Sequence, residues 1–88
     1  MNIIPRSDLS GSHRTGTLMG IGASTINDIL GFEPNVDDDP HKVKYSWGFT
    51  VDGVVCGIWD YKDSSSRGIF STFGPHEIFK KLFPNHYP

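Results

Sequence analysis

The clearest alternation of apolar and polar positions runs from Lys42 to Val51. Valine and aromatic residues occupy every second position of this stretch, and lysine, serine, glycine and threonine lie between them. A period of two predicts a half-buried antiparallel strand. Asp52-Gly53 follows, a pair that accepts the positive φ angles of a tight hairpin turn. We therefore predict a hairpin whose returning strand runs from Val54 to Tyr61.

The register of this hairpin decides where Trp59 and Tyr61 point. With a two-residue loop, both side chains project from the sheet face opposite Trp47. With a three-residue loop and a glycine bulge, Tyr45 pairs with Trp59, and a cross-strand ion pair forms nearby. Such cross-strand pairs contribute a few tenths to about 1 kcal/mol each. We favour the two-residue loop, because it places aliphatic side chains of the returning strand on the same face as Trp47.

Helical spacing of apolar residues appears twice. The residues from Ser24 to Leu30 carry one apolar stripe, and Gly31 is placed to end that helix. A second helix is predicted after Gly74-Pro75, with a stripe that continues until Pro84 stops it. Lysines near its C-terminus complement the helix dipole.

Short strands are predicted at Thr17 to Ile21 and at Ile69 to Phe73. The predicted fold class is α+β: an antiparallel three- to four-stranded meander sheet with two short helices packed on one face. With 88 residues, the chain forms one small domain, residues 1–88. Residues 1–16 are predicted to be a loosely ordered N-terminal segment.

Two loops invite a functional interpretation. Ser7 to Gly16 is rich in turn-forming residues and contains Arg14, so it is either a mobile surface loop or an anion-binding loop. The connector from Phe32 to His41 contains Asp37-Asp38-Asp39. It lacks the spaced ligands, the glycine and the distal glutamate of a calcium loop, so we expect a solvated acidic loop.

Composition narrows the function classes. Lys and Arg number 8 against 10 Asp and Glu, a net charge of −2, which lacks the basic excess of a duplex-DNA binder. No apolar stretch approaches the roughly 20 residues of a membrane span, and no secretory signal pattern is present. A single cysteine without zinc-like spacing leaves neither a metal nor a disulfide to stabilise the monomer, so we expect a homo-oligomer.

Nothing in the sequence indicates catalysis. The four histidines are scattered, and Cys56 lies within a predicted strand, so we expect neither an enzyme nor a cofactor. A binding face is the stronger interpretation: outward Trp59 and Tyr61 would stack on a flat ring, a contact worth roughly 1–3 kcal/mol per base. The basic residues expected to meet phosphates there are Lys44, Lys62, Arg67 and Arg14. Alternatively, both aromatic residues belong to the core or to a dimer interface.

Several motifs resemble those of a recurrent group of small phage-encoded proteins. These proteins carry an F-G-x-P element, a K-V-x-x-x-W-x-F strand, a D-G turn and an I-x-[DN]-[YW]-K strand. The matching residues here are GFEPN, PHKVKYSWGFTVDGVVCGIWDYK and FSTFGP, with Gly31-Phe32 in inverted order. The resemblance covers roughly Ile26 to Phe73.

The resemblance implies an anti-defence role in the host cytoplasm, because small phage proteins of this size often antagonise host immunity. The first hypothesis is a protein that sequesters a nucleotide-derived immune signal, of the cyclic nucleotide or ADP-ribose type, without catalysis. The second is an inhibitor of a host defence protein, as anti-CRISPR proteins are, in which Trp59, Tyr61 and the acidic Asp37 to Asp39 loop form the contact patch. The third is a virion accessory protein.

Overall fold

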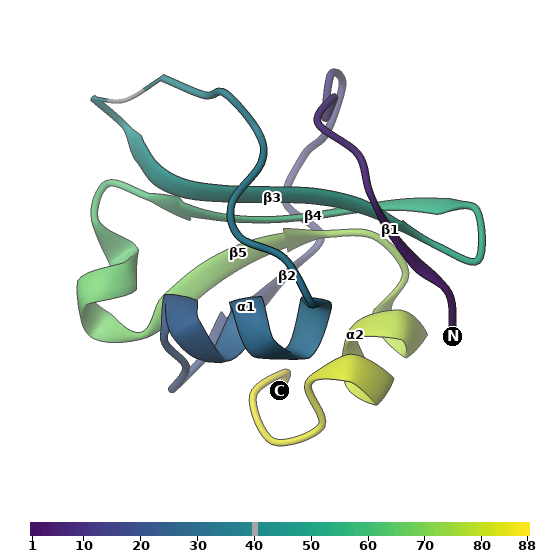
Figure 1. Cartoon of the computed structure of the whole chain (residues 1–88). Coiled ribbons are helices and arrows are strands. Elements are labelled where there is room, and N and C mark those ends of the chain that lie inside the picture. Colours follow the sequence, from purple (N-terminus) through teal and green to yellow (C-terminus); the bar gives the residue numbers. More distant parts are fainter. Residues whose placement is uncertain (40) are drawn as a thin grey trace.

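The hairpin predicted in the middle of the chain forms the centre of the folded sheet (Figure 1). In the computed structural model, which describes residues 1–39 and 41–88, one antiparallel sheet has the strand order β1-β3-β4-β5-β2. The elements in chain order are β1 (Ile3–Pro5), β2 (Gly16–Met19), α1 (Ala23–Leu30), β3 (Val43–Val51), β4 (Val54–Tyr61), the 3₁₀ helix η1 (Ser64–Arg67), β5 (Ile69–Phe73) and α2 (His76–Leu82). The class is α+β as predicted, but the sheet has five strands in place of three or four.

Two strands lie outside the predicted meander of β3, β4 and β5. β2 joins the far edge of β5, where Leu18 lies opposite Phe70. β1 pairs with β3, with Pro5 opposite Phe49. The expectation of a loosely ordered segment is therefore wrong for Ile3–Pro5. Proline is tolerated in β1 because an edge strand needs fewer backbone donors for the ladder.

The ladder between β3 and β4 has the register of a two-residue turn. Val51 pairs with Val54, and Trp47 pairs with Ile58. Asp52 and Gly53 have φ angles of 50° and 84°, as a type I′ turn requires. The favoured register is thus confirmed between these pairs, and the three-residue alternative is wrong. A two-residue loop would also pair Tyr45 with Asp60, but a bulge takes the place of this pair, because the register shifts between Val43 and Ser46.

Asp60 holds this bulge together. Its side chain is fully buried, and Oδ1 accepts hydrogen bonds from the backbone N–H groups of Lys44, at 2.8 Å, and Tyr45, at 2.7 Å. Oδ2 accepts a third hydrogen bond from the hydroxyl of Ser65, at 2.6 Å. A buried carboxylate is stable only with such partners. Ser65 belongs to η1, so the segment predicted as a plain polar turn is a short 3₁₀ helix that serves the sheet.

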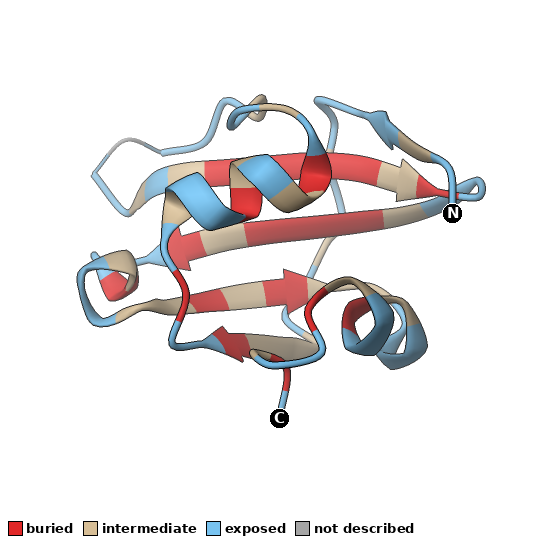
Figure 2. Cartoon of the chain, turned by 60° about the horizontal axis from the view of Figure 1, so that its bottom comes forward, coloured by how far each residue is buried: buried red, intermediate tan, exposed pale blue. Residues whose placement is uncertain are grey.

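Both helices cover the same face of the sheet, below the strands in Figure 1. The core lies between these two layers, and Figure 2 shows the buried segments in the middle of the strands and on the inner sides of the helices. Its fully buried side chains include Trp47, Phe49, Phe70, Ile26 of α1 and Phe79 of α2. The indole N–H of Trp47 donates to Asn27 Oδ1 at 2.9 Å.

The helix ends follow local signals in part. Gly31 ends α1 with a φ of 89°, and its N–H donates to the carbonyl oxygen of Asn27 at 2.8 Å, as predicted. The start of α1 differs from the predicted start at Ser24. The helix begins at Ala23, and its cap residue, Gly22, has no side chain to accept a hydrogen bond. Pro75 precedes α2 as the cap residue. Within the described residues, no helix has the length and apolar character needed to cross a membrane.

Two irregular segments lie over the face opposite the helices (Figure 1). Leu9, from the N-terminal segment, lies over the Gly48–Gly57 pair. A Cβ atom on Gly57 would meet Leu9 Cδ1 at 2.7 Å, and one on Gly48 would collide with the carbonyl oxygen of Arg6. The two glycines therefore allow the N-terminal segment to approach the sheet closely.

Asn35 fastens the second segment, the connector between α1 and β3, to the outer edge of β3. Its side-chain amide donates to the Gly48 carbonyl oxygen at 2.9 Å and accepts from the Gly48 N–H at 2.8 Å. Its backbone N–H donates to the Ser46 carbonyl oxygen at 3.0 Å. Asp37, Asp38 and Asp39 follow and are exposed, as predicted for the acidic loop. Pro40, also in the predicted connector, lies outside the described residues.

Candidate functional site

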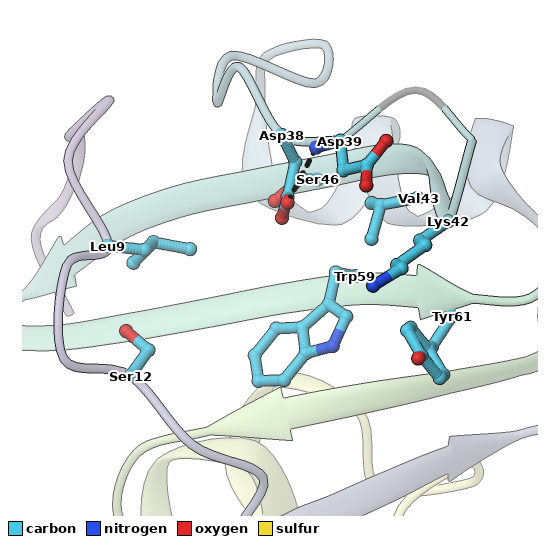
Figure 3. Close-up of a pocket in the computed structure, with 9 residues that line it drawn as sticks. All are labelled: Leu9, Ser12, Asp38, Asp39, Lys42, Val43, Ser46, Trp59 and Tyr61. Atoms are coloured by element: carbon cyan, nitrogen blue, oxygen red, sulfur yellow. Dashed lines mark hydrogen bonds between the residues drawn. The ribbon is translucent and has the colours of Figure 1, made fainter.

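A pocket of about 280 Å³ opens on the face opposite the helices (Figure 3). We call it the Trp59 pocket. It is bounded by the start of β3, the end of β4, the connector and the N-terminal segment. Its lining residues are Leu9, Ser12, Asp38, Asp39, Lys42, Val43, Ser46, Trp59 and Tyr61.

Two aromatic rings form one side of the pocket. Trp59 is half-buried, and Tyr61 has 44% of its surface exposed. Trp59 lies opposite Ser46 and Tyr61 lies opposite Val43, so these side chains share one face of the sheet. The confirmed register therefore directs Trp59 and Tyr61 away from Trp47.

Three charged residues of the connector form the opposite rim. Asp38 Oδ1 accepts from the Asp39 N–H at 2.8 Å, and the Asp39 carbonyl oxygen accepts from the Lys42 N–H at 3.0 Å. These bonds fold the rim into a turn. The Lys42 side chain points into the pocket, between Asp39 and the aromatic rings (Figure 3). Two carboxylates against one ammonium give the pocket a net negative formal charge.

Ser46 adds a polar group that lacks a partner. Its surface is only 3% exposed, and its hydroxyl has no hydrogen-bond partner among the described residues. A buried hydroxyl without a partner costs about 1–3 kcal/mol. Since Ser46 lines the Trp59 pocket, a ligand group that reaches this hydroxyl would recover that cost.

The predicted ligand-binding residues are only partly brought together. Trp59 and Tyr61 line the pocket, and the Lys62 ammonium lies 5.4 Å from the centre of the Tyr61 ring, outside the lining. The Lys44 ammonium lies 5.4 Å from the ring centre of Tyr45, and that ring stacks on Trp47, so Lys44 is associated with the helix face.

The two arginines lie elsewhere. Arg67 is the exposed last residue of η1, and Arg14 is exposed in the loop before β2. Neither contributes to the lining of the Trp59 pocket. The structure therefore does not gather the basic residues that were expected to meet phosphates around Trp59.

The second hypothesis already combined the Asp37 to Asp39 loop with Trp59 and Tyr61, and Asp38 and Asp39 do line the pocket. Ser46 and Lys42 were not among the predicted site residues. The two-residue register does indicate Ser46, because it sets Ser46 opposite Trp59. No local signal indicates Lys42, and the position of this rim depends on the long-range bonds between Asn35 and β3.

The loop from Ser7 to Gly16 has a local carboxylate of its own. The N–H and the hydroxyl of Ser10 donate to Asp8 Oδ1 at 2.9 and 2.6 Å. These two bonds hold the pKa of the Asp8 carboxyl below its usual value. Both donors of Ser10 thus already bind a carboxylate of the chain, which weakens the interpretation of this loop as an anion site.

A second pocket, of about 250 Å³, shares Leu9 and Asp38 with the Trp59 pocket. Asp8 and Asp37 also line it. Carboxylates therefore continue along the surface beyond the Trp59 pocket. We call Asp8, Asp37, Asp38 and Asp39 the acidic strip.

Neither the candidate nucleophile, Cys56, nor the residue types that bind metals form a site among the described residues. Cys56 is fully buried on the helix face, and burial raises the pKa of its thiol to about 11. Within residues 1–39 and 41–88, no group of three or more His, Cys, Asp or Glu side chains is placed to hold a metal ion. The Trp59 pocket is therefore the feature best suited to a function.

The arrangement can bind but has no obvious group to activate. It offers flat aromatic surface, a pair of carboxylates, one exposed ammonium and a buried hydroxyl. No protein-family model matches the chain, and no curated protein or solved structure matches it significantly.

Proposed function

We propose that this chain is a non-catalytic binding protein that engages a protein partner through the Trp59 pocket and the acidic strip. The observation that supports this most directly is the combination of Trp59 and Tyr61 with two carboxylates in one pocket. Aromatic residues at the centre of a patch, with charged residues around them, are typical of protein–protein contact sites.

The charge of the pocket favours a basic side chain over a nucleotide-derived signal, since Asp38 and Asp39 repel phosphates and only Lys42 attracts them. Its volume of about 280 Å³ is close to the lower limit of the roughly 300–1,000 Å³ that holds a drug-sized ligand. A partner with basic residues is attracted by the acidic strip instead.

The resemblance to small phage-encoded proteins supplies the biological setting of the proposal. The chain would act in the host cytoplasm as an inhibitor of a defence protein. The buried thiol of Cys56, with its raised pKa, favours binding over nucleophilic catalysis.

Plaque assays test this function directly. The chain is expressed in host strains that each carry one defence system, and phage growth is measured. Restored growth is expected in one such strain, and Trp59→Ala with Tyr61→Ala should abolish it. Met19→Ala is the control, because Met19 is 49% exposed yet lies outside the Trp59 pocket. Failure to protect phage in every strain would favour a virion accessory role.

Sequestration of a nucleotide-derived signal is the second candidate function. Lys42 favours it, because an ammonium that points into a pocket beside Trp59 could meet one phosphate while the indole stacks on a base (Figure 3). Thermal unfolding with cyclic dinucleotides and ADP-ribose derivatives tests this candidate, since a native-state ligand raises the midpoint. Recovering the ligand unaltered would separate sequestration from hydrolysis, and an unchanged midpoint with every compound would contradict this candidate.

Self-association is the remaining part of the proposal. Ile4 of the edge strand β1 is 51% exposed, and Met1, which precedes β1 in the chain, is 60% exposed. Apolar side chains on an unpaired edge favour contact with a second copy. Native mass spectrometry measures the stoichiometry, and Ile4→Lys should shift an oligomer toward monomer; a monomer at all concentrations would overturn this part.

A further inference from the structure

We propose that the Trp59 pocket recognises the guanidinium group of an arginine side chain that the partner presents. This inference rests on the proposed binding function and names the chemical group that enters the pocket. Four features of the pocket lead to it: its charge, its flat walls, its buried hydroxyl and the position of Lys42.

The charge of the pocket selects a cation. Asp38 and Asp39 line it, and the hydrogen bonds that fold the rim use Oδ1 of each carboxylate. These bonds leave the Oδ2 atom of each carboxylate as an acceptor. A charge-assisted hydrogen bond to a carboxylate is about twice as strong as a neutral one.

The walls select a flat cation. The indole of Trp59 and the ring of Tyr61 form adjoining surfaces on one side of the pocket (Figure 3). A guanidinium is planar and less strongly hydrated than an ammonium, so it stacks on aromatic faces at a smaller desolvation cost. Arginine therefore matches these walls better than lysine.

The hydroxyl of Ser46 supplies a further acceptor. It is buried, lines the pocket and has no partner among the described residues. A guanidinium has five N–H donors in a fixed fork, whereas an ammonium has three on one atom. A guanidinium that stacks on Trp59 therefore has donors for the carboxylates of the rim and for the Ser46 hydroxyl.

Lys42 is the chain's own cation in this site. Its side chain points into the pocket toward the place that a guanidinium would take (Figure 3). Lys42 is exposed, so it can swing outward when a ligand arrives. Removing its charge should strengthen arginine binding and weaken the binding of any phosphate. This opposite response separates the two kinds of ligand.

The two tryptophans make the test specific. The indole N–H of Trp47 is bonded to Asn27 in the core, whereas Trp59 borders the pocket. The NMR signals of the two indole N–H groups are followed during titration with the blocked peptide acetyl-Gly-Arg-Gly-amide. Matched peptides contain lysine or citrulline, the neutral analogue of arginine, and free L-arginine is a further titrant. We expect the Trp59 signal to move with the arginine peptide and the Trp47 signal to stay.

Substitutions then assign the contacts. Lys42→Gln should lower the dissociation constant for the arginine peptide about two- to fivefold, and Asp38→Asn with Asp39→Asn should raise it about three- to tenfold, as expected for exposed charges. Trp59→Phe keeps an aromatic wall and should weaken binding less than Trp59→Ala. Tighter binding of free L-arginine than of the peptide would mean that the pocket recognises the free amino acid and not a protein side chain.

Three results would overturn the inference: tighter binding of free L-arginine than of the peptide, equal shifts with the citrulline or lysine peptide, or a Trp59 signal that does not move at tens of millimolar arginine peptide. The plaque assay separates this failure from that of the proposed function. If growth still depends on Trp59 while no arginine peptide binds, the binding function stands and the arginine assignment is wrong. If neither holds, both are wrong.

Discussion

The two tryptophans lie on neighbouring strands, yet they serve opposite faces of the sheet. Trp47 is fully buried, its indole N–H is bonded to Asn27, and its ring packs edge-on against Phe70 with centroids 5.7 Å apart. Trp59 is half-buried on a pocket wall opposite a serine. The helices complete one face, whereas two irregular segments cover the other. Residues of the same type thus differ in role because of what covers their face.

The largest expected contrast is in stability. Trp47→Ala removes a large core side chain and should lower the free energy of unfolding by about 3–5 kcal/mol. Trp59→Ala removes a half-buried side chain from the pocket wall and should cost less, about 1–2 kcal/mol. Urea unfolding followed by far-ultraviolet circular dichroism measures both variants. Equal losses of unfolding free energy would mean that the pocket face stabilises the fold as much as the face that the helices cover.

The bulge beside the pocket gives the second contrast. Asp60→Ala leaves two partly buried backbone N–H groups and the Ser65 hydroxyl without their acceptor, and should cost about 2–3 kcal/mol. Asp60→Asn is the matched control. It keeps one carbonyl oxygen for the two N–H groups, so we expect a loss of about 1 kcal/mol. Equal losses would show that the charge, and not the hydrogen bonds, holds the bulge.

The two segments that cover the pocket face can be tested at the glycine pair. A Cβ atom on Gly48 meets the backbone carbonyl of Arg6, whereas one on Gly57 meets the flexible side chain of Leu9. Gly48→Ala should therefore cost about 1–3 kcal/mol, the usual range for overpacking, and Gly57→Ala less. The same urea titrations measure this, and the reverse order would contradict the close approach of the N-terminal segment.

Local signals explain what the sequence predicts correctly. Asp52-Gly53 specifies the hairpin turn, and its two-residue length carries the register as far as Trp47. Gly31 ends α1 because glycine accepts the left-handed conformation. The outward direction of Trp59 follows from the same register.

The missed features depend on contacts between distant parts of the chain. β1 forms because β3 offers it an edge, although Pro5 argues locally against a strand. The bulge needs Asp60 to meet Lys44, Tyr45 and Ser65 at once. The acidic rim reaches the pocket only because Asn35 binds β3. Periodicity does not report such contacts. The scaffold of the site was therefore predictable, whereas Lys42 was not predicted and the Asp37 to Asp39 loop was joined to Trp59 only as part of the inhibitor hypothesis.

The smallest expected effect is a pH dependence of the free energy of unfolding that comes from Cys56, on the helix face. Burial raises the pKa of the Cys56 thiol from 9.0 to about 11. Below pH 9, the folded and unfolded chains both keep this proton, so Cys56 adds no pH dependence. Between pH 9 and about 11, the unfolded chain releases the proton and the folded chain retains it, so the free energy of unfolding falls as the pH rises, by about 2 kcal/mol at most.

Cys56→Ala isolates this effect from the tyrosines and lysines that titrate in the same range. Its free energy of unfolding should fall less steeply between pH 8 and 10.5 than that of the unmodified chain. Iodoacetamide supplies an independent measurement, because only the thiolate reacts. Alkylation of the folded chain at pH 8 should be far slower than that of the chain in urea. Parallel pH slopes together with rapid alkylation would mean that water reaches Cys56, and the helix face would then be as open as the face that carries Trp59.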